Sequence, residues 1–455
     1  MPAGGSATAP ATPTAVVAAC GNNKITVSWP AVTGATSYNV YRSTVTGAAG
    51  TLAGSTATTS YIDTAGTVGS TYYYTVAAVS STGASSSSAE VSETFYKLQA
   101  GAMQGKSLAL TGNVATVAGS SGFSGLVDGM GTAARFSLPY GVTTDGSYFY
   151  VADYLNNAIR KIDPVTKAVS VFAGSPAGTS GYADGVGTAA LFFRPYDITS
   201  DGASLFVTEF NGCMIRKIDI ATATVSTFAG QSGVCGPSTD GIGAAAIFAK
   251  PKGITTDGTD LYVTDGVRVR KVNIATKAVS TFAGTGAVGH VDSVGTTASF
   301  NNLEGITTDG TSLFVADRYY QDIRKIVIAT GAVSSLAGNF NNVTTTASTD
   351  GTGTGATFNL PMGITTDGTN LYVTESSSGV TGGGYVVRKI ANGTTAAAGT
   401  GVVTTTAGLA GAGGTADGTG GAGGTARFRS LWGITVYCGN LIIVDNGNSS
   451  IRKLY

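Results

Sequence analysis

The chain has 455 residues, and its hydrophobic content of 42% is enough to fill the cores of two or three domains. Charged residues make up only 11%, and 26 Lys and Arg balance 26 Asp and Glu, so that the net charge is zero. This balance argues against nucleic acid as a partner, because binding to phosphates needs a basic excess or a basic patch.

The start of the chain predicts no regular structure. Residues 1–13 consist of Ala, Gly, Pro, Ser and Thr with one Met, a composition that predicts a flexible tail. This stretch lacks the basic start and the apolar run of a signal peptide, and we expect Met1 to replace a leader that was removed. No apolar run in the chain approaches the ~20 residues of a membrane span, so no transmembrane segment is expected.

Residues 14–97 show short alternating strands separated by turn-rich segments. In residues 25–29 the side chains of Ile25, Val27 and Trp29 fall on one face of a strand, and residues 38–42 and 72–76 alternate in the same way. Such a series predicts a β-sandwich. Together these segments resemble bacterial fibronectin type III domains, which implies an N-terminal fibronectin-III-like sandwich over 14–97, followed by a linker over 98–112.

From residue 113 onward one pattern recurs six times. Its fullest form comprises 184–192, Pro195, 198–202, 205–209, 215–219 and 225–230. An opening acid recurs at Asp128, Asp184, Asp240, Asp292, Asp350 and Asp417, and an arginine at Arg160, Arg216, Arg270, Arg324, Arg388 and Arg452. This spacing, with four strand-like pieces in each unit, predicts the blades of a β-propeller.

The repeated unit resembles NHL-repeat propellers in Pro361, in 363–367, in 371–375 and in 388–390. The resemblance implies an all-β chain with a six-bladed NHL-type propeller over 113–455. The chain ends with a third strand at 451–455, and residues 114–119 match the fourth strand at 225–230. We therefore expect 114–119 to close the ring by pairing with the C-terminal blade.

Residues that every blade repeats are expected to serve folding rather than one unique site. The six opening acids are interpreted as turn-capping residues. Calcium sites are the alternative, but one carboxylate in each loop supplies few ligands. A second set of acids follows strand two and is expected to cap its loop or to pair with the blade arginine: Asp153, Glu209, Asp265, Asp317, Glu375 and Asp445.

Residues that vary between blades carry more information about function. The position before strand one is Tyr140, Tyr196, Lys252, Glu304, Met362 and Trp432. The variable loop after strand two contributes Tyr154, Phe210, Arg318, Tyr319 and Tyr320, and in blade five runs long, from 376 to 385. Both sets should open on one face of the ring, and an aromatic-rich rim of this kind predicts a ligand-binding surface. The alternative is that they are ordinary packed or solvated loop residues.

Catalytic residues are not apparent in the sequence. Lactonase or lyase propellers need a histidine cluster or a metal cage around the channel, whereas this chain has one histidine, His290, expected to be exposed. Only Glu304 and Asp197 stand out of pattern among the channel acids. We expect no metal, no cofactor and no enzyme activity. A lactonase- or esterase-like propeller hydrolase is the alternative.

Four cysteines bear on the compartment. Cys213 and Cys235 flank the last two strands of blade two and are expected to form a disulfide in an oxidising environment. For Cys20 and Cys438 the sequence leaves both a disulfide and a free thiol open.

The sequence as a whole favours a binding or scaffold protein, extracellular or at the cell surface, with the periplasm possible. It would hold a protein or glycan partner. A self-assembling subunit of a surface layer or filament is a further alternative.

Overall fold

The computed structural model describes residues 8–340, 347–376, 384–421 and 424–455. The chain divides into two compact units, one comprising Met1–Lys97 with Gln104–Lys106 and the other Leu98–Met103 with Ser107–Tyr455. Regular structure in the described part is β-strand together with short 3-10 turns. The expected tail and the expected loop over 376–385 lie partly outside the described residues, at 1–7 and 377–383.

Unit one contains two antiparallel sheets with a shared core. The first sheet contains β1 (Val17–Gly21), β2 (Lys24–Ser28) and β5 (Ser60–Asp63). The second contains β3 (Ser37–Ser43), β4 (Thr51–Thr56), β6 (Thr71–Ser80), β7 (Gly83–Ala84) and β8 (Val91–Thr94). Alternate residues of β2, β3 and β6 are buried, and Val27, Val40 and Tyr74 meet in the core. Each strand thus has one apolar face that the other sheet covers.

A short hairpin, β9 (Lys97–Gln99) and β10 (Ala102–Gln104), follows unit one in the chain. Its tip consists of Ala100 and Gly101, with φ of 54° and 72°. Two consecutive left-handed residues are the geometry of a tight two-residue hairpin turn. Residues 98–103, assigned to a linker from the sequence, pack within unit two.

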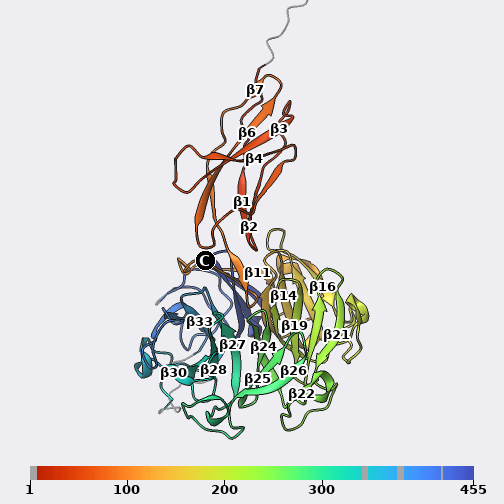
Figure 1. Ribbon diagram of the computed structural model, residues 1–455, viewed down its shortest axis with the longest axis vertical. Helices are drawn as coiled ribbons and strands as arrows, with labels where there is room; N and C mark the ends of the chain where they lie inside the picture. The colour runs from red at the N-terminus through yellow and green to blue at the C-terminus, as the bar shows by residue number, and fades with distance from the viewer. Residues whose placement is uncertain (1–7, 341–346, 377–383, 422–423) are drawn as a thin grey trace, which may run out of the picture. The chain divides into compact units, whose positions relative to one another are not determined.

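Unit two contains six antiparallel sheets in its described residues, each with four or five strands (Figure 1). In chain order the first three sheets contain β12 (Gly129–Met130), β13 (Pro139–Thr144), β14 (Phe149–Asp153), β15 (Ala158–Ile162) and β16 (Ala168–Ala173); β17 (Gly185–Val186), β18 (Pro195–Ser200), β19 (Ser204–Glu209), β20 (Met214–Asp219) and β21 (Thr224–Ala229); β22 (Gly241–Ile242), β23 (Pro251–Thr256), β24 (Asp260–Asp265), β25 (Arg268–Asn273) and β26 (Ala278–Ala283). The next two contain β27 (Leu303–Thr308), β28 (Ser312–Asp317), β29 (Asp322–Val327) and β30 (Val333–Gly338); β31 (Gly351–Thr352), β32 (Pro361–Thr366), β33 (Leu371–Glu375), β34 (Val386–Ala391) and β35 (Val402–Gly408). The last contains β11 (Val114–Gly119), β36 (Leu431–Tyr437), β37 (Asn440–Asp445) and β38 (Ser450–Leu454).

Seven 3-10 turns complete the described elements of unit two. They are η1 (Gly131–Ala133), η2 (Tyr154–Asn156), η3 (Gly187–Ala189), η4 (Gly243–Ala245), η5 (Gly295–Thr297), η6 (Gly353–Gly355) and η7 (Asn446–Asn448). Five of them lie in the connection that begins with the opening acid, and η2 and η7 lie in the loop after strand two.

The sheets form a closed ring. The inner strands β13, β18, β23, β27, β32 and β36 contact one another in that order, and β36 contacts β13. The strand β11 pairs with β38, with Val114 opposite Leu454 and Gly119 opposite Ser450. The first and last segments of unit two therefore share one sheet, which leaves neither of them as an open edge. Sheets arranged radially around a channel are the architecture of a β-propeller.

Each sheet of the ring holds one buried arginine between two carboxylates. In the second sheet, Arg216 donates to Asp184 Oδ1 over 2.8 Å and to Glu209 Oε1 over 2.9 Å, and its guanidinium lies 5.1 Å from the ring centre of Phe192. Burial raises the pKa of Glu209 to about 7, although Arg216 opposes this shift. The other sheets repeat the arrangement around Arg160, Arg270, Arg324, Arg388 and Arg452. The interpretation of the opening acids as turn caps is therefore incomplete: they are ion-pair partners of the arginine.

Candidate functional site

A collar of glycines surrounds one end of the channel. The inner strands place Gly141, Gly253, Gly305, Gly363 and Gly433 around it. A Cβ atom on Gly253 would lie 2.3 Å from the carbonyl oxygen of Glu304, and one on Gly363 would lie 2.3 Å from that of Trp432. The inner strands approach so closely here that a side chain would collide with the next sheet. The sixth position of the collar is Asp197.

A small hollow opens at this mouth. Its volume is ≈ 30 Å³, and the residues that line it beside the collar are Tyr140, Tyr196, Glu304, Met362 and Trp432. All five belong to the variable position selected from the sequence. That position was predicted to precede strand one, but it is the second residue of each inner strand. The sixth member of that position, Lys252, lies beside the hollow and contacts Glu304.

Aromatic rings form one side of the mouth. The ring of Tyr140 lies 4.0 Å from Trp432, 4.4 Å from Tyr154 and 4.8 Å from Tyr196, measured between ring centres. Tyr196 also stacks on Phe210 at 5.3 Å. We call these five residues the aromatic cluster. Such contacts hold large aromatic side chains in fixed positions. Tyr196 is buried, and the other four rings are partly open to solvent.

Glu304 links the charged groups on the other side of the mouth. Its Oε1 accepts a hydrogen bond from Lys252 Nζ at 2.7 Å and one from Arg318 at 3.2 Å, and its Oε2 accepts one from the Tyr196 hydroxyl at 2.8 Å. Lys252 donates a second bond to Asn302. Glu304 and Lys252 are both buried. A buried carboxylate with three donors is held in one position, and it is electrically compensated.

Asp197 forms the floor of the hollow and has a different environment. Its side chain borders both the mouth and the channel cavity below it. The carboxylate accepts a hydrogen bond from the backbone N–H of Ile254 at 3.1 Å. Burial raises the pKa of Asp197 to about 7, and the negative charge of Glu304 adds to this shift. No Lys, Arg or His in the described chain forms an ion pair with it.

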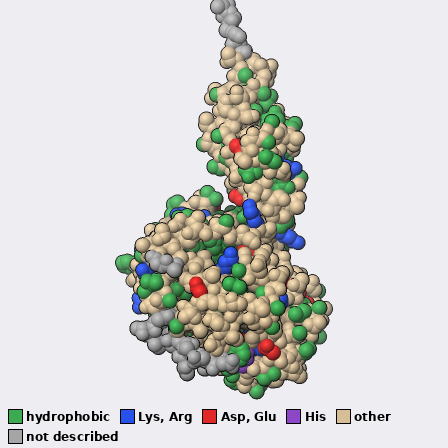
Figure 2. All heavy atoms as spheres, turned by 90° about the vertical axis from the view of Figure 1, so that its left-hand side faces the viewer, with side chains coloured by type: hydrophobic (Ala, Val, Ile, Leu, Met, Phe, Trp, Pro, Cys, Tyr) green, Lys and Arg blue, Asp and Glu red, His purple; other side chains and the backbone are tan. Residues whose placement is uncertain are grey.

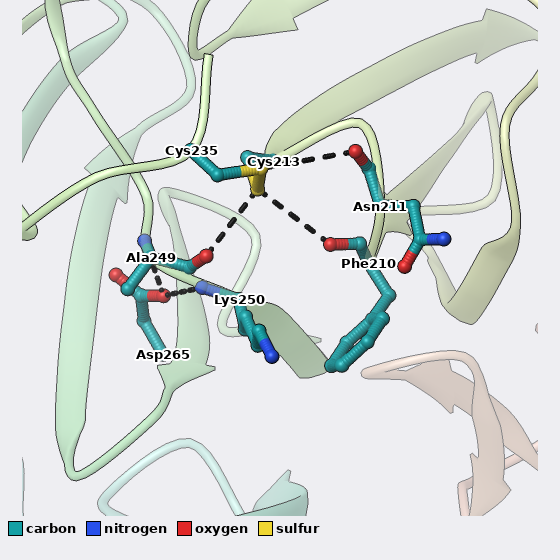
Figure 3. Close-up of a disulfide and its surroundings, with 7 residues drawn as sticks. All are labelled: Phe210, Asn211, Cys213, Cys235, Ala249, Lys250 and Asp265. Atoms are coloured by element: carbon teal, nitrogen blue, oxygen red, sulfur yellow. Dashed lines mark hydrogen bonds between the residues drawn. A yellow bond between two sulfur atoms is a disulfide. The ribbon is translucent and has the colours of Figure 1, made fainter. Parts of the chain in front are cut away.

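A disulfide anchors the loop that carries Phe210 (Figure 3). Cys213 and Cys235 are joined, with their Cα atoms 5.3 Å apart. Cys213 ends the loop after β19 that carries Phe210, and its sulfur lies 3.6 Å from the Phe210 carbonyl oxygen and 3.3 Å from that of Ala249. The bond thus fixes the loop whose ring stacks on Tyr196. None of the described cysteines, Cys20 and Cys438 included, is a free thiol, so that alternative is not supported.

The tip of the β9–β10 hairpin closes the opposite end of the channel. The carbonyl oxygen of Gly101 accepts hydrogen bonds from Thr143 Oγ1 at 3.1 Å, from Thr435 Oγ1 at 2.8 Å and from the N–H of Thr144 at 3.1 Å. Ala100 and Gly101 line the channel cavity together with Asp197. The mouth is therefore the open end of a channel that is closed behind Asp197.

The predicted rim residues Arg318, Tyr319 and Tyr320 do not all lie at the mouth. Arg318 joins the mouth through Glu304, and Tyr319 lies beside Arg318 but is 49% exposed. Tyr320 instead contacts His290, with ring centres 5.0 Å apart. The expectation that His290 is exposed is wrong, because its side chain is only 10% exposed, stacks on Phe340 and lies 2.9 Å from Asp322 Oδ2.

Two participants were not recognised from the sequence. From the sequence, Asp197 stands out of pattern because it replaces a glycine of strand one, but it was not assigned to the binding site. The Ala100–Gly101 tip has no such signal, because its role depends on residues from distant strands. Among the described residues no group of three or more His, Cys, Asp and Glu side chains could hold a metal ion.

The outer surface carries little charge. On the face in view in Figure 2, acidic and basic side chains appear as scattered spots among uncharged atoms. None of the helical segments in the described part of the chain is both long and apolar enough to cross a membrane.

Comparisons with known proteins bear on the repeats and the fold. No family model matches the chain. Human NHL repeat-containing protein 2 is 29% identical over 293 residues, which is 56% of this chain and 40% of that protein. The chain thus spans about two fifths of the length of this relative.

Two solved structures from Bacteroides thetaiotaomicron are similar in fold. One is a protein of unknown function, with a TM-score of 0.55 and 16% identity, covering 96% of this chain and 97% of that one. The other is an auxiliary nutrient binding protein, with a TM-score of 0.55 and 14% identity, covering 97% of both chains. These two structures are similar to this chain in fold, and the similarity to the human relative supports NHL-type repeats in the propeller.

Proposed function

We propose that this chain is a non-catalytic binding or scaffold protein that holds a protein or glycan partner at the mouth of the propeller channel. The observation that carries the proposal is the aromatic cluster beside a solvent-open hollow, opposite the charged group around Glu304. Aromatic side chains and arginine are the residue types that dominate the energetics of protein interfaces. The tight packing of the cluster lowers the entropy lost when a partner binds.

The architecture suits this role. We take the six sheets of unit two as the blades of a six-bladed NHL-type propeller, and unit one as a fibronectin-III-like module that acts as a spacer or a docking unit. The strand order of unit one and its shared core support that assignment. We assign binding to unit two because the candidate site lies there, since fold alone does not specify function.

We place the protein outside the cytoplasm, in the extracellular space or at the cell surface. Disulfides persist in oxidising compartments, and Cys213–Cys235 anchors the loop that carries Phe210. The sparse charge also leaves little repulsion between copies, so self-association into a layer or filament is the competing role.

The site contains binding groups rather than an assembled catalytic set. Glu304 is engaged by three donors, two of them cationic, whereas Asp197 accepts hydrogen bonds from backbone N–H groups and has no ion-pair partner among the described residues. A single carboxylate without a paired acid or an activated nucleophile does not complete the usual hydrolytic arrangements. We therefore favour binding over hydrolysis.

The experiment is a binding screen of the full chain against immobilised surface proteins and glycans. Retention by a partner should fall at least tenfold in Tyr140→Ala. It should be unchanged in Tyr182→Ala, whose aromatic ring contacts Phe193 and does not line the mouth. Equal retention of the two variants would overturn the proposal, as would turnover of lactone or ester substrates at enzyme-like rates. Light scattering at rising concentration would identify the self-assembling alternative.

A further inference from the structure

The most unusual group of the propeller channel is the carboxylate of Asp197. Five of the six collar positions are glycine, and Asp197 alone brings a charged side chain to this ring of positions. Among the described residues it has no ion-pair partner, and the negative charge of Glu304 opposes its ionisation. Burying an ionised carboxylate without a counter-charge is costly, and the usual remedies are protonation or a bound cation.

The other walls of the hollow complement a cation. Tyr140, Tyr196 and Trp432 all line it above Asp197. The negative face of an aromatic ring attracts an ammonium group that lies within about 6 Å of the ring centre, and Trp is the strongest of these partners. Lys252 and Arg318 are already bound by Glu304, so neither of them supplies the missing positive charge to Asp197.

Size restricts what reaches the floor. The hollow has a volume of ≈ 30 Å³. A water-sized group needs about 10–15 Å³ of such space, so the hollow admits the end of a slender chain but not a sugar ring. The Ala100–Gly101 tip closes the channel behind Asp197, so a ligand enters only from the mouth and ends there.

We propose that the mouth binds a primary alkylammonium group, presented as a lysine side chain of a protein partner, with the ammonium on Asp197 and the methylene stem against Tyr140, Tyr196 and Trp432. This assignment rests on the proposed binding function of the mouth and narrows it to one class of partner. The Asp197 carboxylate supplies the charge, and the three rings supply the apolar and cation–π contacts.

The test is a calorimetric titration of the full chain with Nα-acetyl-lysine amide at pH 8. Its neutral counterpart, Nα-acetyl-norleucine amide, has a similar stem and no ammonium group. Methyl glucosaminide carries an amine on a sugar ring and represents the glycan source. We expect the lysine probe to bind at least tenfold more tightly than either of the others.

Two variants of Asp197 make the test independent of folding. Asp197→Gly restores the residue found at the other five collar positions and should fold normally, and Asp197→Asn keeps the shape without the charge. Both should lose at least tenfold in affinity for the lysine probe. Equal binding of the lysine and norleucine probes would overturn the proposal, as would wild-type affinity in Asp197→Gly, or a glucosaminide that binds more tightly than the lysine probe. If these variants keep full retention by a screened partner while Tyr140→Ala loses it, the binding function stands and the alkylammonium assignment fails.

Discussion

The hydroxyl of Tyr196 donates a hydrogen bond to Glu304 Oε2 over 2.8 Å, although 108 residues separate the two in the chain. Tyr196 belongs to β18 and Glu304 to β27, the inner strands of the second and fourth sheets. The bond therefore spans the channel mouth between sheets that are not neighbours in the ring. It joins the aromatic cluster to the charged group opposite, so that the two sides of the site form one connected network.

Removing the central carboxylate of this network should destabilise unit two. In Glu304→Gln, Lys252 and Arg318 lose their counter-charge, and Lys252 is buried. Leaving one charge of a buried pair unpaired costs about 3–5 kcal/mol, and we expect the lower end because the mouth admits water. Urea denaturation measures the loss.

A second variant shows whether the unpaired lysine causes this loss. Adding Lys252→Met to Glu304→Gln removes the uncompensated charge and should restore at least half of the stability. The single variant Lys252→Met is measured as well. If the double variant loses as much stability as the two single variants together, the two groups act independently.

Loss of the Cys213–Cys235 disulfide should weaken both stability and the mouth. The bond closes a segment with a sequence separation of 22, for which the chain-entropy relation gives about 3 kcal/mol. Thermal denaturation of Cys213→Ser with Cys235→Ser, compared with the wild type, measures it. We also expect weaker partner binding, because Phe210 loses its anchor. Unchanged stability and binding would contradict this account.

The closed end of the channel is tested by adding one methyl group. A Cβ atom on Gly101 would lie 2.0 Å from Thr143 Oγ1, at a φ of 72°. Gly258 is a matched control, since its φ is 91° but a Cβ atom there meets nothing within 4 Å. Gly258→Ala should lose about 1 kcal/mol through backbone strain alone, and Gly101→Ala about 1–3 kcal/mol more through the collision. Equal losses in urea denaturation would mean that the tip does not fill the channel as described.

The ionisation of Asp197 should make the stability of the protein depend on pH. Burial raises its pKa to about 7 from an ordinary value of 3.8, so between about pH 4 and pH 7 the folded state retains a proton that the unfolded state releases. The contribution of Asp197 to the free energy of unfolding is therefore present in full at low pH, and it is lost as the pH rises from about 4 to about 7. The free energy of unfolding should change by on the order of 2–4 kcal/mol across this range, a value that already allows for water in the channel.

Asp197→Asn removes this titration. Its stability relative to the wild type should be greater at pH 8 than at pH 4.5 by that amount, as measured by urea midpoints. Asp219→Asn serves as a control, because Asp219 is only partly buried and its hydrogen bonds with Thr222 lower its pKa. A relative stability of Asp197→Asn that does not change with pH would place the side chain in free solvent.

Much of the architecture is predictable because it repeats. A pattern written six times averages out local exceptions, so the strands, the buried arginines and the residues around the mouth can be located by comparing one unit with the next. Tyr140, Tyr196, Glu304, Met362 and Trp432 come together because they share one position in the repeat. Their gathering follows from ring geometry and needs no knowledge of individual contacts.

The rest depends on contacts between distant residues, which a repeat pattern does not encode. Tyr319 and Tyr320 are neighbours in sequence, yet Tyr319 lies beside Arg318 while Tyr320 contacts His290. The contact of Gly101 with Thr435 spans 334 residues and occurs outside the repeated units. Such pairs are decided by how loops fold against the sheets, after the local pattern has been satisfied.

The central claim is that partners are held at the channel mouth, and Trp432 reports on it directly. The chain has two tryptophans, and the other, Trp29, lies in the core of unit one. In a Trp29→Phe chain, the emission of Trp432 can be followed while a partner from the binding screen is added. The account predicts a saturable change in emission whose midpoint equals the dissociation constant from calorimetry. Calorimetric binding to saturation without any change in Trp432 emission would contradict it.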